Sequence, residues 1–404
     1  MKKWRQLLLV SGLALCFGMA AKAETQAAGQ VTGLKQVSHS SSSVGVECDA
    51  VLGAEHYYLD LSTDGKEWLT VEASSNPKLT ASKLNAGKSY YARVGLCTDW
   101  NGEKKVAGTE SAAIEVVTAP SGTVDAVQSD AKTNGISVKG NAISGANFYR
   151  LYYDKVLLGQ SASSTVSTST KMNAGTSYWC HFYACRKSAA GYVAEGSYDY
   201  DYFKTLAPAF NTKGFGLSNA WESINSYQFA ASAAYAKDGV QFQFLTPGGK
   251  VKKNVYQDGT SSTVSLYVDK FINGNFYKYR VRPYVKCGTS RMFGGWSGYK
   301  YIGVPKKVSS KFSSKKKTVT LSISNVSNAS SFTVYASTKK NSGFKKVKIV
   351  SAKKRSVAIK KVAGKKLKRN KYYYFKIVPN AKVGKKTYSS QYQSVYSWRY
   401  YKLY

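Results

Sequence analysis

A short motif that recurs four times constrains the fold of this chain more than any other feature of its sequence. In each copy a large apolar residue precedes a tyrosine by six positions, and apolar or small residues follow that tyrosine two and four positions later. A period of two places these side chains on one face of a β-strand. The four pairs are Leu84 and Tyr90, Met172 and Tyr178, Phe271 and Tyr277, and Leu367 and Tyr373.

The spacing of the motif sets the size of the repeating unit. The four tyrosines are separated by 88, 99 and 96 residues, which is the length of a small domain. Short alternating segments broken by Gly, Asn, Ser and Asp predict about seven strands in each unit, and helical periodicity is absent beyond the N-terminus. We therefore predict an all-β chain of four tandem β-sandwiches. In the less regular third unit we expect Val240, Phe242 and Phe244 to form a strand, and Asp64-Gly65 predicts a two-residue hairpin turn.

The repeats resemble fibronectin type III domains. Besides the apolar residue and tyrosine of the motif, they share a Gly-Ala pair before an aromatic strand, as at Gly53-Ala54, and a closing Thr-x-Pro, as at Thr118-Ala119-Pro120. The resemblance implies that Tyr90, Tyr178, Tyr277 and Tyr373 form structural tyrosine corners. The tryptophan usual in the second strand of that family is missing, and Cys48, Gly140 and Ile323 stand near its place, so an immunoglobulin-like variant of the sandwich stays open.

The segments between the repeats predict the domain boundaries. Proline-containing joins place fibronectin type III-like units at 24–118, 119–206, 207–304 and 305–404. Residues 1–23 have the pattern of a signal peptide: basic Lys2, Lys3 and Arg5, an apolar stretch, and small residues around a cleavage site after Ala23. We expect a secreted or surface-associated chain with no membrane span once the signal is removed. A retained anchor and lipid attachment at Cys16 are the alternatives.

Five cysteines remain after the signal peptide: Cys48, Cys97, Cys180, Cys185 and Cys287. An odd number cannot pair completely within one chain. Two interpretations are open, namely small buried hydrophobic side chains or one bridge between Cys48 and Cys97. No pair has the spacing or the neighbouring histidines of a zinc site, so we expect neither a metal ion nor a cofactor.

The chain offers little for catalysis. It has no GxSxG or HExxH motif, and its nearest paired acids are Asp199 and Asp201. Residues two apart share a strand face, and we expect these aspartates on the solvated side, with Tyr198, Tyr200 and Tyr202 on the other side. The prediction is a protein that is not an enzyme.

Most of the net positive charge lies in one unit. The formal net charge is +37, and residues 305–404 contain 27 Lys and Arg but no Asp or Glu. The 24 lysines among them favour diffuse attraction to a polyanion over bidentate recognition; protection of exposed strand edges is the alternative. The candidate polyanion-binding residues are Lys315, Lys316, Lys317, Lys345, Lys346, Lys353, Lys354, Arg355, Lys365, Lys366, Lys368, Arg369, Lys385 and Lys386.

Three aromatic residues, Tyr396, Trp398 and Tyr400, share one face of the last predicted strand. That face is either the inner one or an outward stacking platform. The leading hypothesis is a binding or spacer protein whose basic unit attaches to an anionic cell-wall or extracellular polysaccharide. The alternatives are a carbohydrate-binding accessory protein that uses exposed aromatic residues and an extracellular nucleic-acid binder.

Overall fold

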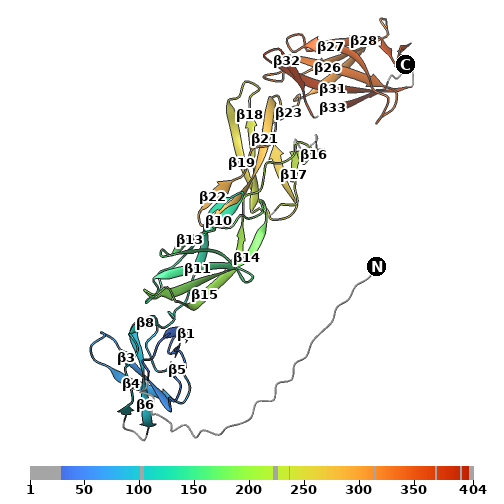
Figure 1. The fold of residues 1–404 in the computed structure, drawn as a ribbon. Coiled ribbons are helices and arrows are strands. Elements are labelled where there is room, and N and C mark those ends of the chain that lie inside the picture. The colour runs from blue at the N-terminus through green and yellow to red at the C-terminus, as the bar shows by residue number, and fades with distance from the viewer. Residues whose placement is uncertain are drawn as a thin grey trace, which may run out of the picture. The chain divides into compact units, whose positions relative to one another are not determined.

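The computed structural model describes residues 29–404 except 101–103, 222–225, 236, 314, 369–370, 392–393 and 400–404, and only the backbone of 99–100, 104–105, 221 and 394–399. The predicted signal peptide and Arg369 therefore lie outside the described residues. The described residues contain strands, turns and no helix, and they form four successive β-sandwiches (Figure 1). Each sandwich encloses its own cluster of buried side chains, because alternate residues of its strands face inward.

The first sandwich consists of a three-stranded sheet, β1-β2-β5, and a sheet ordered β4-β3-β6-β7, in which β8 also pairs with β6. Six residues separate β3 from β4, so the predicted two-residue turn is wrong: the Asp64 carboxylate accepts the amides of Lys66 and Glu67 and builds a longer loop. The strands are β1 (Lys35–His39), β2 (Val44–Glu47), β3 (His56–Ser62), β4 (Leu69–Ser74), β5 (Lys78–Ala81), β6 (Ser89–Trp100), β7 (Lys104–Val106) and β8 (Ile114–Val117).

The second sandwich repeats this arrangement, with sheets ordered β13-β10-β9 and β12-β11-β14-β15. Cys180, Phe182 and Ala184 of β14 are fully buried in its core. The strands are β9 (Ala126–Lys132), β10 (Gly135–Gly140), β11 (Phe148–Tyr153), β12 (Val156–Ser161), β13 (Thr165–Ser167), β14 (Ser177–Lys187) and β15 (Val193–Lys204).

The third sandwich has sheets ordered β16-β17-β20 and β19-β18-β21-β22, and β23 also pairs with β21. Val240, Phe242 and Phe244 lie on β18 and are buried, as expected from the sequence. The strands are β16 (Phe215–Trp221), β17 (Ser226–Ser232), β18 (Gly239–Leu245), β19 (Val251–Asp258), β20 (Thr263–Asp269), β21 (Phe276–Cys287), β22 (Ser290–Phe293) and β23 (Lys300–Gly303).

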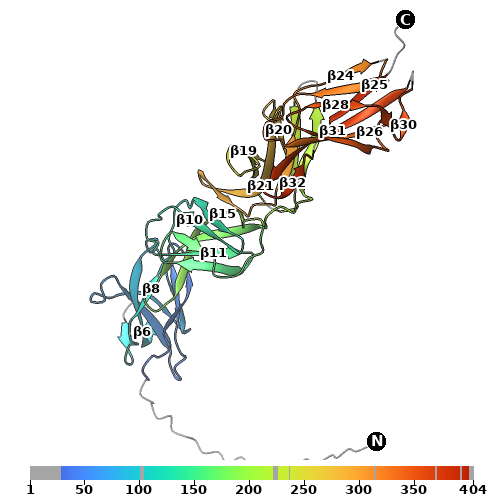
Figure 2. The same ribbon diagram turned by 90° about the horizontal axis from the view of Figure 1, so that it is seen from above.

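The fourth sandwich has sheets ordered β24-β25-β28 and β27-β26-β31-β32, with β33 paired to β31 and a small β29-β30 ribbon (Figure 2). The strands are β24 (Val308–Ser313), β25 (Thr318–Ile323), β26 (Ser331–Ser337), β27 (Lys345–Ser351), β28 (Ser356–Ile359), β29 (Lys361–Val362), β30 (Lys365–Lys366), β31 (Tyr372–Val383), β32 (Lys386–Ser389) and β33 (Ser394–Arg399).

All five described cysteines are buried and unbridged, so the alternative of a Cys48–Cys97 disulfide is wrong. Cys48 and Cys180 belong to sandwich cores as small apolar side chains, and Cys287 belongs to a small apolar cluster with Ala131 and Val285. Burial raises the pKa of the Cys180 thiol to about 12, and burial is also the main cause that raises the pKa of Cys287 to about 11.

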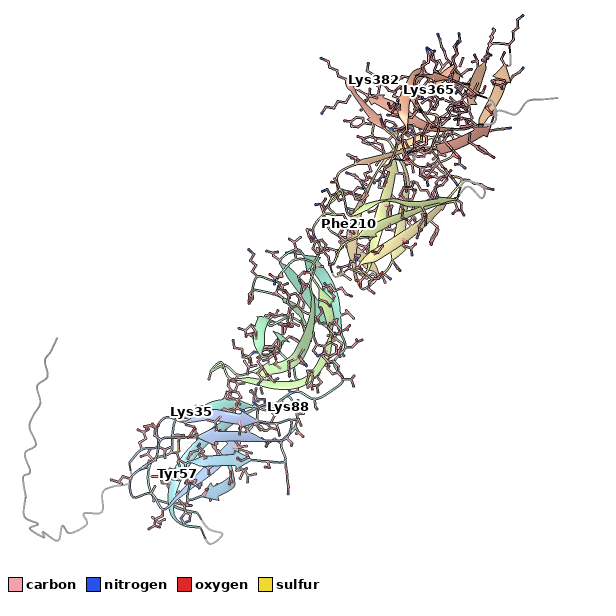
Figure 3. All side chains as sticks on the ribbon, turned by 90° about the vertical axis from the view of Figure 1, so that its right-hand side faces the viewer. Lys35, Tyr57, Lys88, Phe210, Lys365 and Lys382 are labelled. Carbon is pink, nitrogen blue, oxygen red and sulfur yellow. The ribbon has the colours of Figure 1, made fainter. Side chains whose placement is uncertain are left out.

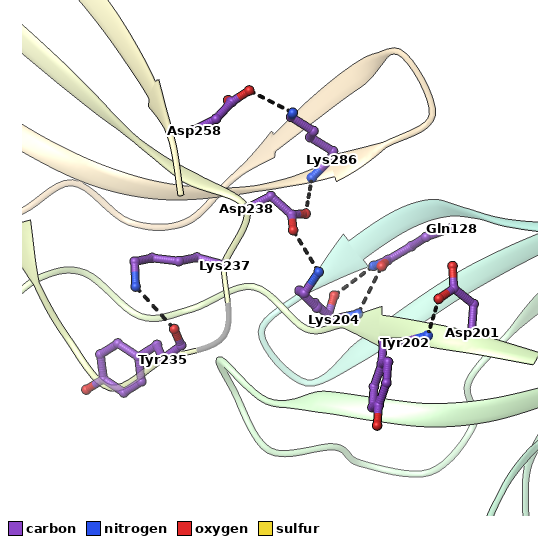
Figure 4. Close-up of polar contacts among 9 residues, drawn as sticks. All are labelled: Gln128, Asp201, Tyr202, Lys204, Tyr235, Lys237, Asp238, Asp258 and Lys286. Atoms are coloured by element: carbon purple, nitrogen blue, oxygen red, sulfur yellow. Dashed lines mark hydrogen bonds and ion pairs between the residues drawn. The ribbon is translucent and has the colours of Figure 1, made fainter. Parts of the chain in front are cut away.

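Contacts within the chain divide it into two compact units, one of residues 1–121 with 186–196 and one of 122–185 with 197–404. The second unit joins three sandwiches. At the joint of the second and third, Lys204 Nζ lies 2.7 Å from Asp238 Oδ1, and Asp238 Oδ2 accepts the Lys286 amide (Figure 4). Beside these ions, Ala131, Val285 and Cys287 form a small apolar cluster.

The joint of the third and fourth sandwiches is also packed. Phe276 of β21 is fully buried in the core of the fourth sandwich. The rings of Tyr301 and Tyr388 stack with centroids 4.2 Å apart, and the Ser390 hydroxyl bonds both the amide and the carbonyl of Gly303. At both joints, side chains of neighbouring sandwiches contact one another directly.

Candidate functional site

The tyrosines of the recurring motif fix the start of the long strand in three sandwiches. The hydroxyl of Tyr90 accepts the Asn85 amide at 3.0 Å, that of Tyr178 accepts the Asn173 amide at 2.8 Å, and that of Tyr373 accepts the Lys368 amide at 2.7 Å. Among the described residues no such bond reaches Tyr277, whose ring instead stacks on Phe271 with centroids 4.8 Å apart. In the first three sandwiches a glycine with positive φ stands three positions before the tyrosine and makes the turn possible, as at Gly175 with φ of +63°. In the fourth, Asn370 occupies that position.

Two observations decide the fold. Each of the four units packs a three-stranded sheet on a larger sheet in the same strand order, and in three units the motif tyrosine hydroxyl accepts the backbone amide five residues before it. The fold is that of tandem fibronectin type III domains. No protein-family model matches the sequence, and no curated protein matches it.

Solved structures with this fold are similar to the chain. The FN1–FN3 domains of chicken CNTN1 are 12% identical, cover 92% of this chain and 99% of their own, and give a TM-score of 0.19. A tetra-tandem repeat from the extending region of a large adhesion protein is 10% identical, covers 91% and 98%, and gives 0.24. The sixth fibronectin type III domain of human fibronectin type III domain containing protein 3 is 17% identical, covers 25% and 94%, and gives 0.21.

The described residues show no arrangement typical of a metal site or a membrane span. Within them, no three His, Cys, Asp or Glu side chains gather as metal ligands would. The part of the chain that the structure describes has no helix with the length and apolarity needed to cross a bilayer.

The candidate basic residues of the fourth sandwich lie in turns or at strand ends, and every one that the structure describes is exposed. Lys365 and Lys382 are labelled in Figure 3, where nitrogen-tipped side chains project from this sandwich. Because no Asp or Glu follows Asp269, these ammonium groups have no acidic side chain within their own sandwich. By contrast, Arg93 of the first sandwich lies 2.6 Å from Glu110.

The strand register separates the candidate basic residues into two groups at opposite ends of the fourth sandwich. Ser331 pairs with Ser351 and Asn380 at the end that adjoins the third sandwich, where Ser327 also pairs with Asn275. Ala336 pairs with Lys345 and Phe375 toward the opposite end. We call the group at that opposite end the distal lysine end; it consists of Lys315, Lys316, Lys317, Lys345, Lys346, Lys365, Lys366 and Lys368.

The second group of basic residues lies at the end near the third sandwich. It consists of Lys353, Lys354, Arg355, Lys385 and Lys386. The predicted polyanion-binding residues that the structure describes therefore form two separate clusters, of which the distal lysine end is the larger.

The aromatic row predicted in the last strand falls largely outside what the structure describes. The backbone of β33 pairs Tyr396 with Phe375 and Trp398 with Tyr373. The side chains of Tyr396 and Trp398, and all of Tyr400, lie outside the described residues. Whether this row faces the core or forms an outward platform therefore stays a prediction.

The second sandwich also has an aromatic surface that the sequence pattern did not predict. Tyr198, Tyr200 and Tyr202 are 50%, 53% and 57% exposed, while the Asp199 carboxylate accepts the Ala126 amide at 2.9 Å. The tyrosines and aspartates do alternate, and Asp201 is exposed and Asp199 half-buried, in keeping with the expected solvated side. The tyrosines are exposed as well, so the expectation that they lie away from solvent is wrong. We call this surface the aromatic face; it consists of Tyr152, Trp179, His181, Tyr183, Tyr198, Tyr200 and Tyr202.

Proposed function

We propose that the protein is an exported, non-catalytic spacer that holds an anionic envelope or extracellular polysaccharide through its fourth sandwich. The observation that carries the proposal is the set of 27 basic and no acidic residues in 305–404. Charge of one sign repels itself and destabilises a folded domain, so a surface that needed only solubility would mix signs. A polyanion relieves the repulsion.

The distal lysine end is the best-placed part of this sandwich to meet a polymer. It lies at the end away from the joint formed by Ser327, Tyr388 and Ser390, and its lysines are exposed. Lysine ammonium groups on flexible stems attract a charged chain without fixing its geometry.

The salt dependence of binding tests the proposal. The full-length protein is applied to immobilised polygalacturonate, with the same resin carrying no polysaccharide as the blank, between about 50 and 500 mM NaCl. We expect binding at low salt that weakens steeply, because each neutralised charge releases a counterion. Absence of binding at low salt, or binding that salt does not change, contradicts the proposal.

Two matched variants locate the site. In one, Lys315, Lys316, Lys317, Lys365 and Lys366 are changed to Gln; in the other, five exposed lysines of the first two sandwiches are changed. The first variant should elute at lower salt and the second should elute as the parent. The control positions are Lys66, Lys83, Lys88, Lys139 and Lys155.

Sheared duplex DNA as competitor tests the nucleic-acid alternative. If the protein preferred nucleic acid, DNA would displace it from the resin at a lower concentration of phosphate groups than the concentration of carboxylate groups that free polygalacturonate needs.

A further inference from the structure

The aromatic face covers the outer side of the sheet β12-β11-β14-β15. On β14, Trp179, His181 and Tyr183 alternate with three buried residues of the core, so they project outward. The tyrosines of the neighbouring strand β15 join them. Trp179 is 38% exposed, and no described element of the second sandwich covers this side.

The rings form one continuous layer. The Trp179 ring lies 5.0 Å from Tyr200 and 4.6 Å from Tyr202, measured between centroids. His181 lies 5.6 Å from Tyr198, which stacks on Tyr183 at 4.9 Å. Mutual packing of this kind holds rings in place before any ligand arrives, so little side-chain entropy is lost on binding.

A large exposed aromatic surface usually marks a binding site. Its charge indicates what it binds. Two copies of a chain with net charge +37 repel each other, which disfavours a second copy as the occupant. Single-stranded nucleic acid needs cations beside its stacking rings, but Arg150, next to Tyr152, is the one cationic side chain that the described contacts place at this layer.

We propose that the aromatic face binds a neutral polysaccharide. The apolar faces of sugar rings pack on aromatic rings, and tyrosine hydroxyls at the edges of the layer exchange hydrogen bonds with sugar hydroxyls. The second sandwich itself has eight basic and six acidic residues, so its charge is nearly balanced. This site is separate from the distal lysine end and does not depend on it.

Affinity gel electrophoresis tests the proposal with dextran, a soluble β-1,3-glucan and a mannan as the three probes. We expect at least one probe to retard the full-length protein equally at about 50 and 500 mM NaCl, since the contact involves no ion pair. The double variant Trp179→Ala, Tyr200→Ala should bind that probe about tenfold more weakly or worse, the loss that stacking partners cause. Trp179→Phe should retain most of the binding.

The control is Tyr267→Ala, at a tyrosine of the third sandwich that is 60% exposed. It should bind as the parent does, and so should the variant of the distal lysine end, which separates this proposal from the preceding one. Failure of all three probes to retard the protein overturns the proposal, as does equal binding by the double variant. A concentration-dependent dimer that the double variant loses also overturns it, because the face would then pair two copies.

Discussion

The second and third sandwiches place different residues at the same three outward positions of their long strand. Counting from the motif tyrosine, Trp179, His181 and Tyr183 of β14 correspond to Lys278, Arg280 and Arg282 of β21. In the second sandwich these three side chains are rings that pack on other aromatic rings. In the third they are cations that lie over aromatic rings.

The cations cover the rings of the third sandwich. The Trp296 ring lies 4.1 Å from the Arg280 guanidinium and 4.3 Å from that of Arg282, and Lys278 lies 4.5 Å from Tyr299. Such stacked pairs satisfy both partners within the sandwich. The corresponding sheet therefore has its outer rings covered by cations in the third sandwich and exposed in the second.

The largest expected difference between the same two strands is the reactivity of their buried thiols, Cys180 in the core of the second sandwich and Cys287 at the joint cluster. Only the thiolate reacts with N-ethylmaleimide, and a pKa of about 12 leaves Cys180 with roughly one thiolate in 10⁴ at pH 8. Cys287, with a pKa of about 11, should react about tenfold faster, and both rates should rise about tenfold from pH 8 to 9, since both pKa values lie above that range. Pulse labelling with peptide mass spectrometry measures the rates.

Denatured protein is the control for thiol labelling, and all of the cysteines should react rapidly there. Native Cys180 that reacts as fast as in the denatured protein would show that the core of the second sandwich is open to solvent.

Removal of the central tryptophan should affect the two outer faces unequally. Trp296→Ala removes the partner of two guanidinium groups and should lower the free energy of opening of β21 by about 2 kcal/mol. Trp179→Ala should cost less than about 1 kcal/mol in β14, because its ring is partly exposed and supports no cation. Native-state hydrogen exchange of the two strands measures both. Equal losses would mean that the aromatic face is a structural layer.

The sequence was sufficient for the sandwiches because their inward positions repeat every second residue beside a motif tyrosine. It was not sufficient for the aromatic face. In the segment from Tyr178 to Cys185 the face opposite the motif tyrosine carries Trp179, His181 and Tyr183, so hydrophobicity alone does not separate the outer face from the inner one. The small residues Cys180 and Ala184 are the available signal, since a core between two sheets accepts them while an outer tryptophan needs room.

The lysines show a second limit of sequence reasoning. Lys315 and Lys365 are far apart in the chain, and only the antiparallel order of the strands places their turns at the same end. The composition of 305–404 predicted a basic surface. Its division into two ends depends on the register, which the sequence pattern does not specify for strands as short as β29 and β30.

The smallest expected difference between the two sandwiches concerns their motif tyrosines. Tyr178→Phe removes the acceptor of the Asn173 amide and should cost about 1 kcal/mol, the usual net value of such a bond. Tyr277→Phe should change stability by less than about 0.5 kcal/mol, because its ring stacking on Phe271 is retained. Native-state hydrogen exchange of the β14 and β21 amides measures both.

Tyr90→Phe is the positive control, since the Tyr90 hydroxyl accepts the Asn85 amide at 3.0 Å. The stability lost in Tyr90→Phe should match that lost in Tyr178→Phe. A loss at Tyr277 as large as at Tyr178 would mean that the third sandwich also has a bonded corner in solution.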